Sequence, residues 1–242
     1  MEISIAKALR SNIQKSLPFH YLILISTLDY FIGLKKKVEL NMLNECKEIL
    51  LSDDQIVSME SGYVYYLQEG TLQLWELHND GVEILINVLK PDDAVRLPDP
   101  SINSVYEFRT NKEKAQLILY KWDSLHKIEE KYYLLNKVAT TTMRTELINH
   151  IKRKKFVKNR LVYLLQFLSQ EFGEIENQYY ILNIPLTHEH LSSLILSSRV
   201  TVTKLLNELK KQKVITNVQG FLYIRKDLID RVGSYDCSLE VV

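Results

Sequence analysis

Residues 185–211 read Pro185-Leu186-Thr187-His188-Glu189-His190-Leu191-Ser192-Ser193-Leu194-Ile195-Leu196-Ser197-Ser198-Arg199-Val200-Thr201-Val202-Thr203-Lys204-Leu205-Leu206-Asn207-Glu208-Leu209-Lys210-Lys211. This stretch predicts two short helices joined by a turn. Thr187 is a good N-cap for the first helix, because its hydroxyl accepts a hydrogen bond from the amide of Glu189 or His190. Ser197-Ser198 then ends that helix and caps the next one. The apolar face of the first helix consists of Leu191, Leu194 and Ile195.

The second helix is expected to have one apolar face and one basic face. Its apolar residues recur at i, i+3, i+4 and i+7, which places them together against a core: Val202, Leu205, Leu206 and Leu209. The opposite face presents Arg199, Val200, Thr203 and Lys204 to solvent. A helix anchored by one face, with its N-terminal residues free, has the geometry that enters the major groove of duplex DNA.

The outward residues also have the chemistry that DNA requires. The planar fork of Arg199 donates two hydrogen bonds to guanine O6 and N7, while Lys204, one turn on, reaches a base edge or a phosphate. Val200 and Thr203 suit thymine methyl groups. The remaining predicted DNA contacts are polar side chains near the two helix N-termini: Thr187, His188, Ser197, Ser198 and Thr201. Taken singly, each residue also has a plainer role as a surface side chain or a cap, so the whole pattern carries the prediction.

The rest of the chain predicts an α+β fold with a barrel before the helices. Residues 1 to about 50 have helical spacing, which includes Ile49 and Leu50 at its end. Residues from about 55 to 120 form short aromatic and β-branched runs separated by turns, typical of a jelly-roll β-barrel. Residues 122–155 contain no Gly or Pro and predict one or two helices. The expected domains are 1–121, a helical lead-in plus a sensor-like barrel; 122–158, a linking and dimerisation helix; and 159–242, a winged helix-turn-helix.

Charge, the placement of Cys and His, and the absence of known motifs limit the possible functions. Residues 150–242 hold 14 Lys and Arg against 9 Asp and Glu, so the DNA-binding third is basic within a chain of net charge +1. We expect no metal or disulfide framework from Cys46 and Cys237, and none from His188 and His190, which lie two apart on a helix. No enzyme motif and no membrane-spanning run is found. The basic run 152–160 is read as a solvated hinge with some attraction to DNA, the alternatives being a phosphate-contacting stripe or a localisation signal.

At this point the chain resembles a known family. Residues from about 159 to 226 are similar to the DNA-binding domain of the Crp/Fnr family, and especially to its cyanobacterial and plastid nitrogen-regulator branch. The residues that carry this resemblance are Arg160-Leu161-Val162, Phe172-Gly173, Leu186-Thr187-His188 and Ser198 to Leu206. Val200 stands where most of the family has glutamate, as in the nitrogen-regulator branch. The resemblance continues weakly through a barrel like those that bind cyclic nucleotides.

The resemblance implies a homodimer on an inverted repeat of double-stranded DNA, control of nitrogen-assimilation genes and contact with RNA polymerase. It also implies location in the plastid stroma or, failing that, the bacterial cytoplasm. The residue usage, with abundant Ile, Lys, Asn and Tyr beside only 7 Gly, is typical of such AT-rich genomes. A degenerate module that has lost specific DNA binding is the alternative, and binding that ignores sequence would reveal it.

Two departures from the family pattern are informative. Leu196 stands where the family usually has Gly in the turn, so we expect either a strained leucine or a distorted turn. The effector motifs are missing, because residues 92–98 lack both a cyclic-nucleotide cassette and the Phe-Gly pair used for 2-oxoglutarate. Arg96 and Arg109 remain candidates for a dicarboxylate, but Asp92 and Asp93 disfavour an anion. We therefore expect no cofactor and little effect of 2-oxoglutarate.

Overall fold

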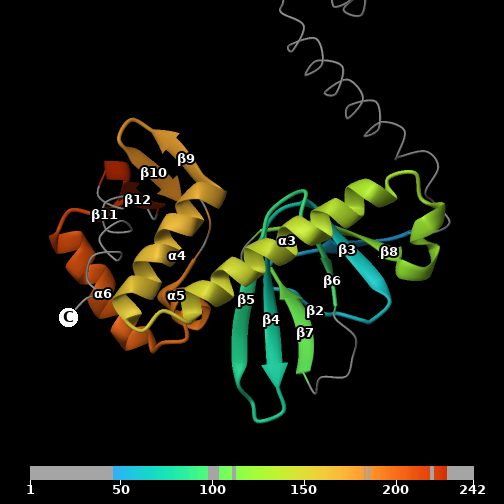
Figure 1. Ribbon diagram of the computed structural model, residues 1–242, viewed down its shortest axis with the longest axis horizontal. Helices are drawn as coiled ribbons and strands as arrows, with labels where there is room; N and C mark the ends of the chain where they lie inside the picture. The colour runs from blue at the N-terminus through green and yellow to red at the C-terminus, as the bar shows by residue number, and fades with distance from the viewer. Residues whose placement is uncertain are drawn as a thin grey trace, which may run out of the picture. The chain divides into compact units, whose positions relative to one another are not determined.

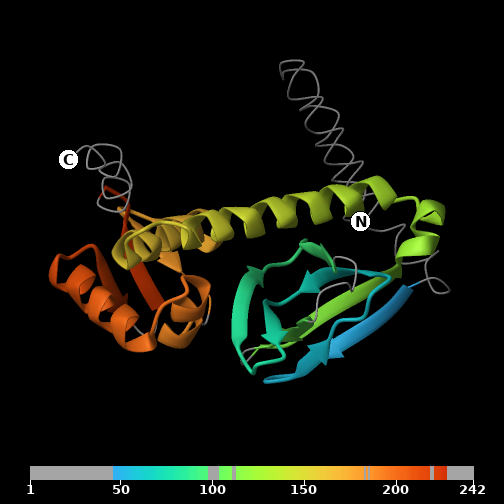
Figure 2. The ribbon, with the colours of Figure 1, turned by 60° about the horizontal axis from the view of Figure 1, so that its bottom comes forward.

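The computed structural model describes residues 46–97, 104–110, 113–182, 184, 186–218 and 221–227. The described residues from Lys47 onward belong to one compact unit. Its N-terminal part is a barrel of two facing sheets, each with four strands (Figures 1 and 2). The first sheet, in the order β1-β8-β3-β6, consists of Cys46–Leu51, Ala115–Lys121, Tyr63–Glu69 and Ala94–Arg96. The second, in the order β2-β7-β4-β5, consists of Ile56–Ser58, Ser104–Arg109, Leu72–His78 and Glu83–Leu89.

Alternation of apolar and polar residues along the strands fills the barrel. The apolar side chains that meet between the sheets include Leu67, Leu72, Leu89, Phe108 and Leu117, all 1% exposed or less. Gly70 is required in the turn before β4, because its φ is +82° and a Cβ there would lie 2.2 Å from the carbonyl oxygen of Lys114. The expected jelly-roll barrel is thus confirmed.

One element was predicted wrongly. Residues 46–50 were expected to be helical, but they form strand β1. Leu50 is 71% exposed while Ile49 and Leu51 turn toward the barrel core, which is the period of two of a strand. The error arose because Ile49 and Leu50 continue a spacing set by Leu40 and Leu43. The predicted helix before residue 46 lies outside the described residues.

Two helical elements follow the barrel. A 3₁₀ helix, η1, spans Trp122–Lys127, and the long helix α3 spans Lys131–Lys152 beside strands β5 and β6 (Figure 1). The side of α3 that faces the barrel is partly polar, with Leu134, Thr141, Arg144, Ile148 and Ile151 buried. Thr141 therefore belongs to the barrel contact and does not weaken an apolar seam.

The C-terminal part is a winged helix-turn-helix, as expected. Its helices are α4 Val157–Phe172, α5 His188–Leu194 and α6 Arg199–Lys211. Its sheet, in the order β11-β12-β10-β9, consists of Ile215–Val218, Phe221–Arg225, Tyr179–Leu182 and Gly173–Glu176. Strand β9 was not predicted. Gly173 ends α4 through close approach, since a Cβ would lie 2.3 Å from Ser169 O, and its φ of −81° is not left-handed. Pro185, which opens the stretch quoted in the sequence analysis, lies outside the described residues.

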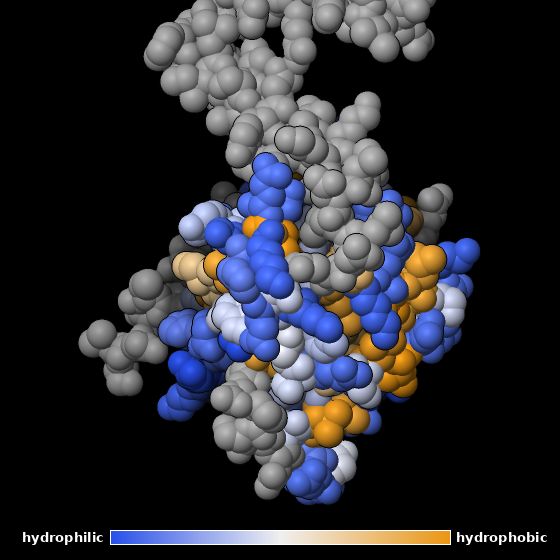
Figure 3. Space-filling model, turned by 90° about the vertical axis from the view of Figure 1, so that its right-hand side faces the viewer, coloured by the Kyte–Doolittle hydropathy of each residue, from blue (hydrophilic) through white to orange (hydrophobic). Residues whose placement is uncertain are grey.

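A second apolar core joins the helices to the barrel. Trp75, Leu85 and Val88 of the barrel pack in the same cluster as Leu165 of α4 and Leu206 of α6. Figure 3 shows one face of the molecule, where apolar side chains are interspersed with charged ones. Among the described residues, no helix is both long and apolar enough to cross a bilayer.

Candidate nucleic-acid interface

The turn between α5 and α6 has the hydrogen bonds of a Schellman motif. Leu196 N–H donates to Ser193 O at 3.2 Å, and Ser197 N–H donates to Ser192 O at 2.9 Å. Leu196 has a φ of +50°, in the left-handed region that glycine adopts at lower cost. The turn is therefore not distorted, and the leucine that replaces glycine is strained by roughly 1 kcal/mol.

Helix α6 begins at a capped end and presents its basic residues outward. The hydroxyl of Ser198 accepts a hydrogen bond from Thr201 N–H at 3.1 Å, as an N-cap does. The outer face of the first turns carries exposed Arg199, Val200 and Lys204. The inner face is buried at Val202, Leu206 and Leu209, while Leu205 is half-buried. Neither Arg199 nor α6 is shielded by the barrel, so the predicted facing of the helix is confirmed.

The hydroxyl groups near the helix N-termini make bonds within the protein. Thr187 accepts from His190 N–H at 3.2 Å, which confirms it as the N-cap of α5. Ser198 and Thr201 share a hydrogen bond of 2.8 Å. Ser197 is half-buried. A hydroxyl that only accepts a hydrogen bond within the protein still has its own hydrogen, which it can donate to a phosphate oxygen.

His188 and Thr203 connect the two helices. Thr203 Oγ1 donates to Arg199 O at 2.8 Å, so its single hydrogen is committed and His188 Nδ1, 2.9 Å away, donates to it. Burial first, and then the charges of Lys210 and Arg199, lower the pKa of His188 below its ordinary 6.5. His188 is therefore neutral at pH 7. The Thr203 hydroxyl is occupied, so only its methyl group suits the predicted thymine contact.

Exposed cations in the hinge between α3 and α4 add to this surface. Arg153, Lys155 and Lys158 are exposed, and no salt bridge within the described ranges engages them. Lys152 differs, because burial lowers its pKa and Glu76 only partly offsets that effect. Carbonyl groups of the hinge and of the α5–α6 turn bind the same guanidinium, that of Arg160. The basic hinge thus lies beside the turn that precedes α6.

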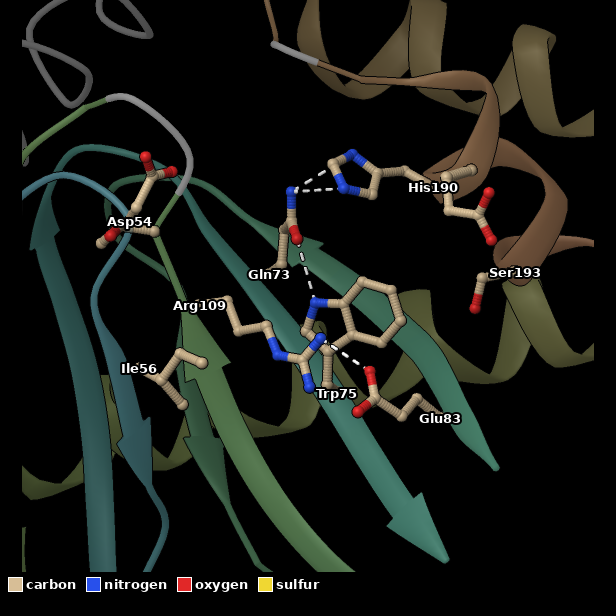
Figure 4. A pocket seen from close by; sticks show the side chains of 10 residues that line it. Asp54, Ile56, Gln73, Trp75, Glu83, Arg109, His190 and Ser193 are labelled. Atoms are coloured by element: carbon tan, nitrogen blue, oxygen red, sulfur yellow. Dashed lines mark hydrogen bonds and ion pairs between the residues drawn. The ribbon is translucent and has the colours of Figure 1, made fainter. Parts of the chain in front are cut away.

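The barrel contacts α5 around a pocket where Gln73 and Trp75 lie near His190 and Ser193 (Figure 4), while the outer face of α6 is exposed. Leu85 N–H donates to Ser193 Oγ at 2.7 Å. Trp75 Nε1 donates to Gln73 Oε1 at 2.9 Å, and Gln73 Nε2 lies 3.3 Å from His190 Nδ1. The pocket at this junction is also lined by Asp54, Glu83, Arg109 and Glu189. These contacts hold α5 on strands β4 and β5.

Two arginines of this region, Arg144 and Arg109, are paired with carboxylates, whereas Arg96 contacts an aromatic ring. Arg144 donates to both carboxylate oxygens of Asp93 at 2.7 Å, and both side chains are buried. Arg109 binds Glu83 at 2.8 Å and also binds Glu107. Arg96 stacks on Trp122 with 3.8 Å from its guanidinium carbon to the ring centre. The dicarboxylate role considered for Arg109 therefore has no support in the geometry, and the contact of Arg96 with Trp122 neither supports nor opposes the role considered for Arg96.

Asp92 anchors the same barrel turn to α3. It accepts hydrogen bonds from the hydroxyls of Tyr66, at 2.9 Å, and Tyr133, and it pairs with Lys137. Burial would raise the pKa of Asp92, but the bonds from Lys137, Tyr133 and Tyr66 outweigh burial and lower it. Burial, and then Asp92, raises the pKa of Tyr133 to about 12. The barrel turn before β6 therefore binds α3 through two successive carboxylates, those of Asp92 and Asp93.

No metal site is found among the described residues, in the sense of three or more clustered His, Cys, Asp or Glu side chains. His188 binds Thr203, and His190 accepts from Thr187 N–H at 3.3 Å. Cys237 lies outside the described residues, so the expectation of no disulfide with Cys46 stays a prediction.

Comparison with known proteins identifies the C-terminal part. The family model of the Crp-like helix-turn-helix domain matches residues 159–228. The chain carries a Crp-like helix-turn-helix domain. This Crp-like domain contains α4, α5, α6 and the winged sheet described above.

Similar proteins extend beyond the Crp-like domain. A protein of Porphyra purpurea named as the HTH-type transcriptional regulator ycf28 is 24% identical over 172 residues, 69% of this chain and 73% of the relative. The global nitrogen regulator of Synechococcus elongatus is 24% identical over 165 residues, 63% of this chain and 72% of the relative. A CRP-family transcriptional regulator from Thermus thermophilus has the same fold, with a TM-score of 0.61 and 18% identity over 77% of this chain and 96% of that one. These relatives are named as transcription regulators, and the barrel with its helix-turn-helix is the fold that this chain shares with the Thermus regulator.

Sequence reasoning missed three residues that shape the Crp-like domain and its attachment. Arg160 was seen as part of a family motif and of the basic run 152–160, without its contacts to the turn, and the pairing of Arg144 with Asp93 was not foreseen. An arginine in the middle of an apolar helix face is a signal of a buried ion pair, but its partner 51 residues away in sequence follows only from the tertiary structure.

Proposed function

We propose that the chain is a sequence-specific DNA-binding transcription regulator that binds an inverted repeat as a homodimer and controls nitrogen-assimilation genes. The observation that carries the proposal is the orientation of α6. Arg199 and Lys204 are exposed on one face while Val202, Leu206 and Leu209 are buried on the other. This orientation lets α6 enter a major groove with its N-terminal turn leading.

The side chains divide into base-reading and phosphate-binding groups. Arg199 donates two hydrogen bonds to guanine, and Val200, 65% exposed, packs against a thymine methyl group. Lys204 reaches a base edge or a phosphate. Thr187, His188, Ser197, Ser198 and Thr201 bind phosphates, and Arg153, Lys155 and Lys158 of the hinge add attraction that does not depend on sequence. This division predicts which substitutions change preference and which change only affinity.

The dimer is proposed to form along α3. Its outward face carries an apolar stripe at three- and four-residue spacing, in which Tyr132 is 75% exposed, Met143 is 73% exposed and Leu147 is 47% exposed. Leu135 and Ala139 continue the stripe between them. A second copy packed on this face is related by a two-fold axis, which matches an inverted repeat.

Three parts are proposed for the chain: a sensor-like barrel up to residue 121, a linking helix over 122–158 and the DNA-binding domain from 159. We infer that the protein acts without 2-oxoglutarate, because residues 92–98 lack the effector motifs and because Arg144 and Arg109 are paired with carboxylates. Nitrogen control follows from the similarity to a global nitrogen regulator. Recruitment of RNA polymerase and location in a plastid follow from the family resemblance and the AT-rich residue usage.

In vitro selection of bound duplexes, followed by titration against salt, tests the proposal. We expect an inverted repeat to be selected, with a salt slope of several. Arg199→Ala is expected to cost about 1–3 kcal/mol on the selected duplex and to relax one base pair per half-site. Lys211→Ala is the matched control, because Lys211 is an exposed cation at the far end of α6. Binding that ignores sequence would support the degenerate module instead.

A further inference from the structure

The side chain of Arg160 joins two segments that are distant in sequence. Arg160 lies in the first turn of α4, and its Nε donates to Lys154 O in the hinge at 2.8 Å. Its Nη1 donates to Ile195 O at 3.0 Å and to Leu196 O at 3.2 Å, in the turn before α6. One guanidinium therefore binds the hinge and the turn together.

The carbonyls that Arg160 binds need a donor. Ile195 is the C-cap of α5, where the last carbonyl groups of a helix have no partner within it, and Leu196 is the next residue, in the turn. A cation is favourable at that end, and bonds from a charged donor are stronger than neutral ones. Because the guanidinium is a planar fork, it donates to both segments at once, which the single ammonium of lysine does not.

The turn before α6 needs these hydrogen bonds more than a turn that contains glycine would. Leu196 is held at a φ of +50°, which is unfavourable for a leucine. Its side chain is 51% exposed, so little packing of its own keeps it there. The hydrogen bonds from Arg160 offset the strain and keep the turn in one conformation.

We propose that Arg160 is a positioning residue, which locks the turn before α6 to the hinge after α3 and so fixes how Arg199 enters the DNA groove without itself touching DNA. Leu196 lies two residues before the cap, Ser198, so the direction of its carbonyl group sets where α6 begins. Through the hinge carbonyl, the position of α3 is coupled to the same turn. This inference rests on the proposed function for its DNA readout.

Two substitutions of Arg160 test the role. Arg160→Met keeps an unbranched stem and removes the donors, and Arg160→Lys keeps the charge without the fork. Lys211→Met is the matched control, because it removes an exposed cation at the far end of α6 to which the proposed interface gives no DNA contact. Specific binding is measured on the duplex selected by the parent protein, and non-specific binding on a random duplex, both across a salt series.

We expect Arg160→Met to weaken specific binding at least tenfold while non-specific binding changes less than threefold. The affinity of Arg160→Lys for the selected duplex is expected to lie between those of the parent and Arg160→Met. Adding Leu196→Gly to Arg160→Met is expected to restore at least threefold of the specific affinity, since glycine needs no help at this φ. Equal loss on both duplexes, with a salt slope lower by about one, would mean that Arg160 contacts phosphate and would overturn the proposal.

Amide hydrogen exchange of the full chain without DNA gives an independent readout. In Arg160→Met we expect the amides of Leu196 and Ser197 to exchange at least tenfold faster, while those of Leu164 and Leu165 in α4 keep their rates. If Arg160→Met fails to fold, Arg160→Lys is measured in the same way, with at least a threefold increase expected. Unchanged exchange in the turn refutes the lock, whereas a parent protein that selects no duplex refutes only the proposed function.

Discussion

Replacing Arg144 by methionine is expected to destabilise the protein by about 3 kcal/mol. Arg144 and Asp93 form a bidentate ion pair with both bonds at 2.7 Å, and their side chains are 9% and 7% exposed. Removing one partner of a buried pair costs roughly 3–5 kcal/mol, because the other charge is left without a counterion. Asp93 keeps a hydrogen bond from Lys90 N–H at 2.8 Å, which places the loss at the lower end of that range.

Urea unfolding followed by tryptophan fluorescence measures the loss. For a slope of about 2 kcal/mol per molar, the midpoint is expected to fall by about 1–2 M with the slope unchanged. Arg153→Met, an exposed matched control, is expected to change the free energy of unfolding by less than about 0.5 kcal/mol. The double variant Arg144→Met with Asp93→Asn should lose less free energy of unfolding than the two single variants together, by at least about 1 kcal/mol. A loss below about 1 kcal/mol for Arg144→Met would show that water screens the pair.

Three further outcomes are expected. Leu196→Gly should raise the free energy of unfolding by roughly 0.5–1 kcal/mol in the same urea assay, since the turn is left-handed; a lower midpoint would contradict the strain. DNA affinity should rise as pH falls from 8 to about 5.5. The pKa of the free His188 is lowered, nearby phosphates raise it again, and binding therefore takes up a proton. His188→Gln should flatten this dependence of DNA affinity on pH. The same group makes the free protein less stable as pH falls through about 6.5. Leu147→Glu should give monomers in sedimentation equilibrium, and a dimer that persists would exclude the α3 seam.

The sequence was enough to predict those elements of the fold that depend on caps and on the spacing of nearby apolar residues. The cap at Thr187 and the leucine spacing of α6 each depend on residues close in sequence. Strand β1 was missed because a few apolar residues, among them Ile49 and Leu50, fit either period. Strand β9 was missed because Gly173–Glu176 has little apolar character, and its pairing with β10 provides the stabilisation instead.

The candidate interface was predictable only in part, for a physical reason. The outward face of α6 follows from helical periodicity, and the exposed Arg199 and Lys204 confirm it. The hydrogen bonds between His188 and Thr203, and those from Arg160 to the turn, join residues 15 or more apart in sequence. Such bonds depend on how α4, α5 and α6 pack, which the spacing of apolar residues leaves open.

The apolar cluster shared by the barrel and the helices has a thermal consequence. Trp75, Leu85 and Val88 are buried against the Crp-like domain, so any swing of α4 to α6 away from β4 and β5 brings these side chains into water. Hydrophobic contacts weaken on cooling, whereas hydrogen bonds such as that from Leu85 N–H to Ser193 do not share this dependence. Reorientation of α6 against the barrel therefore becomes easier in the cold, and the DNA binding proposed above is expected to depend on temperature.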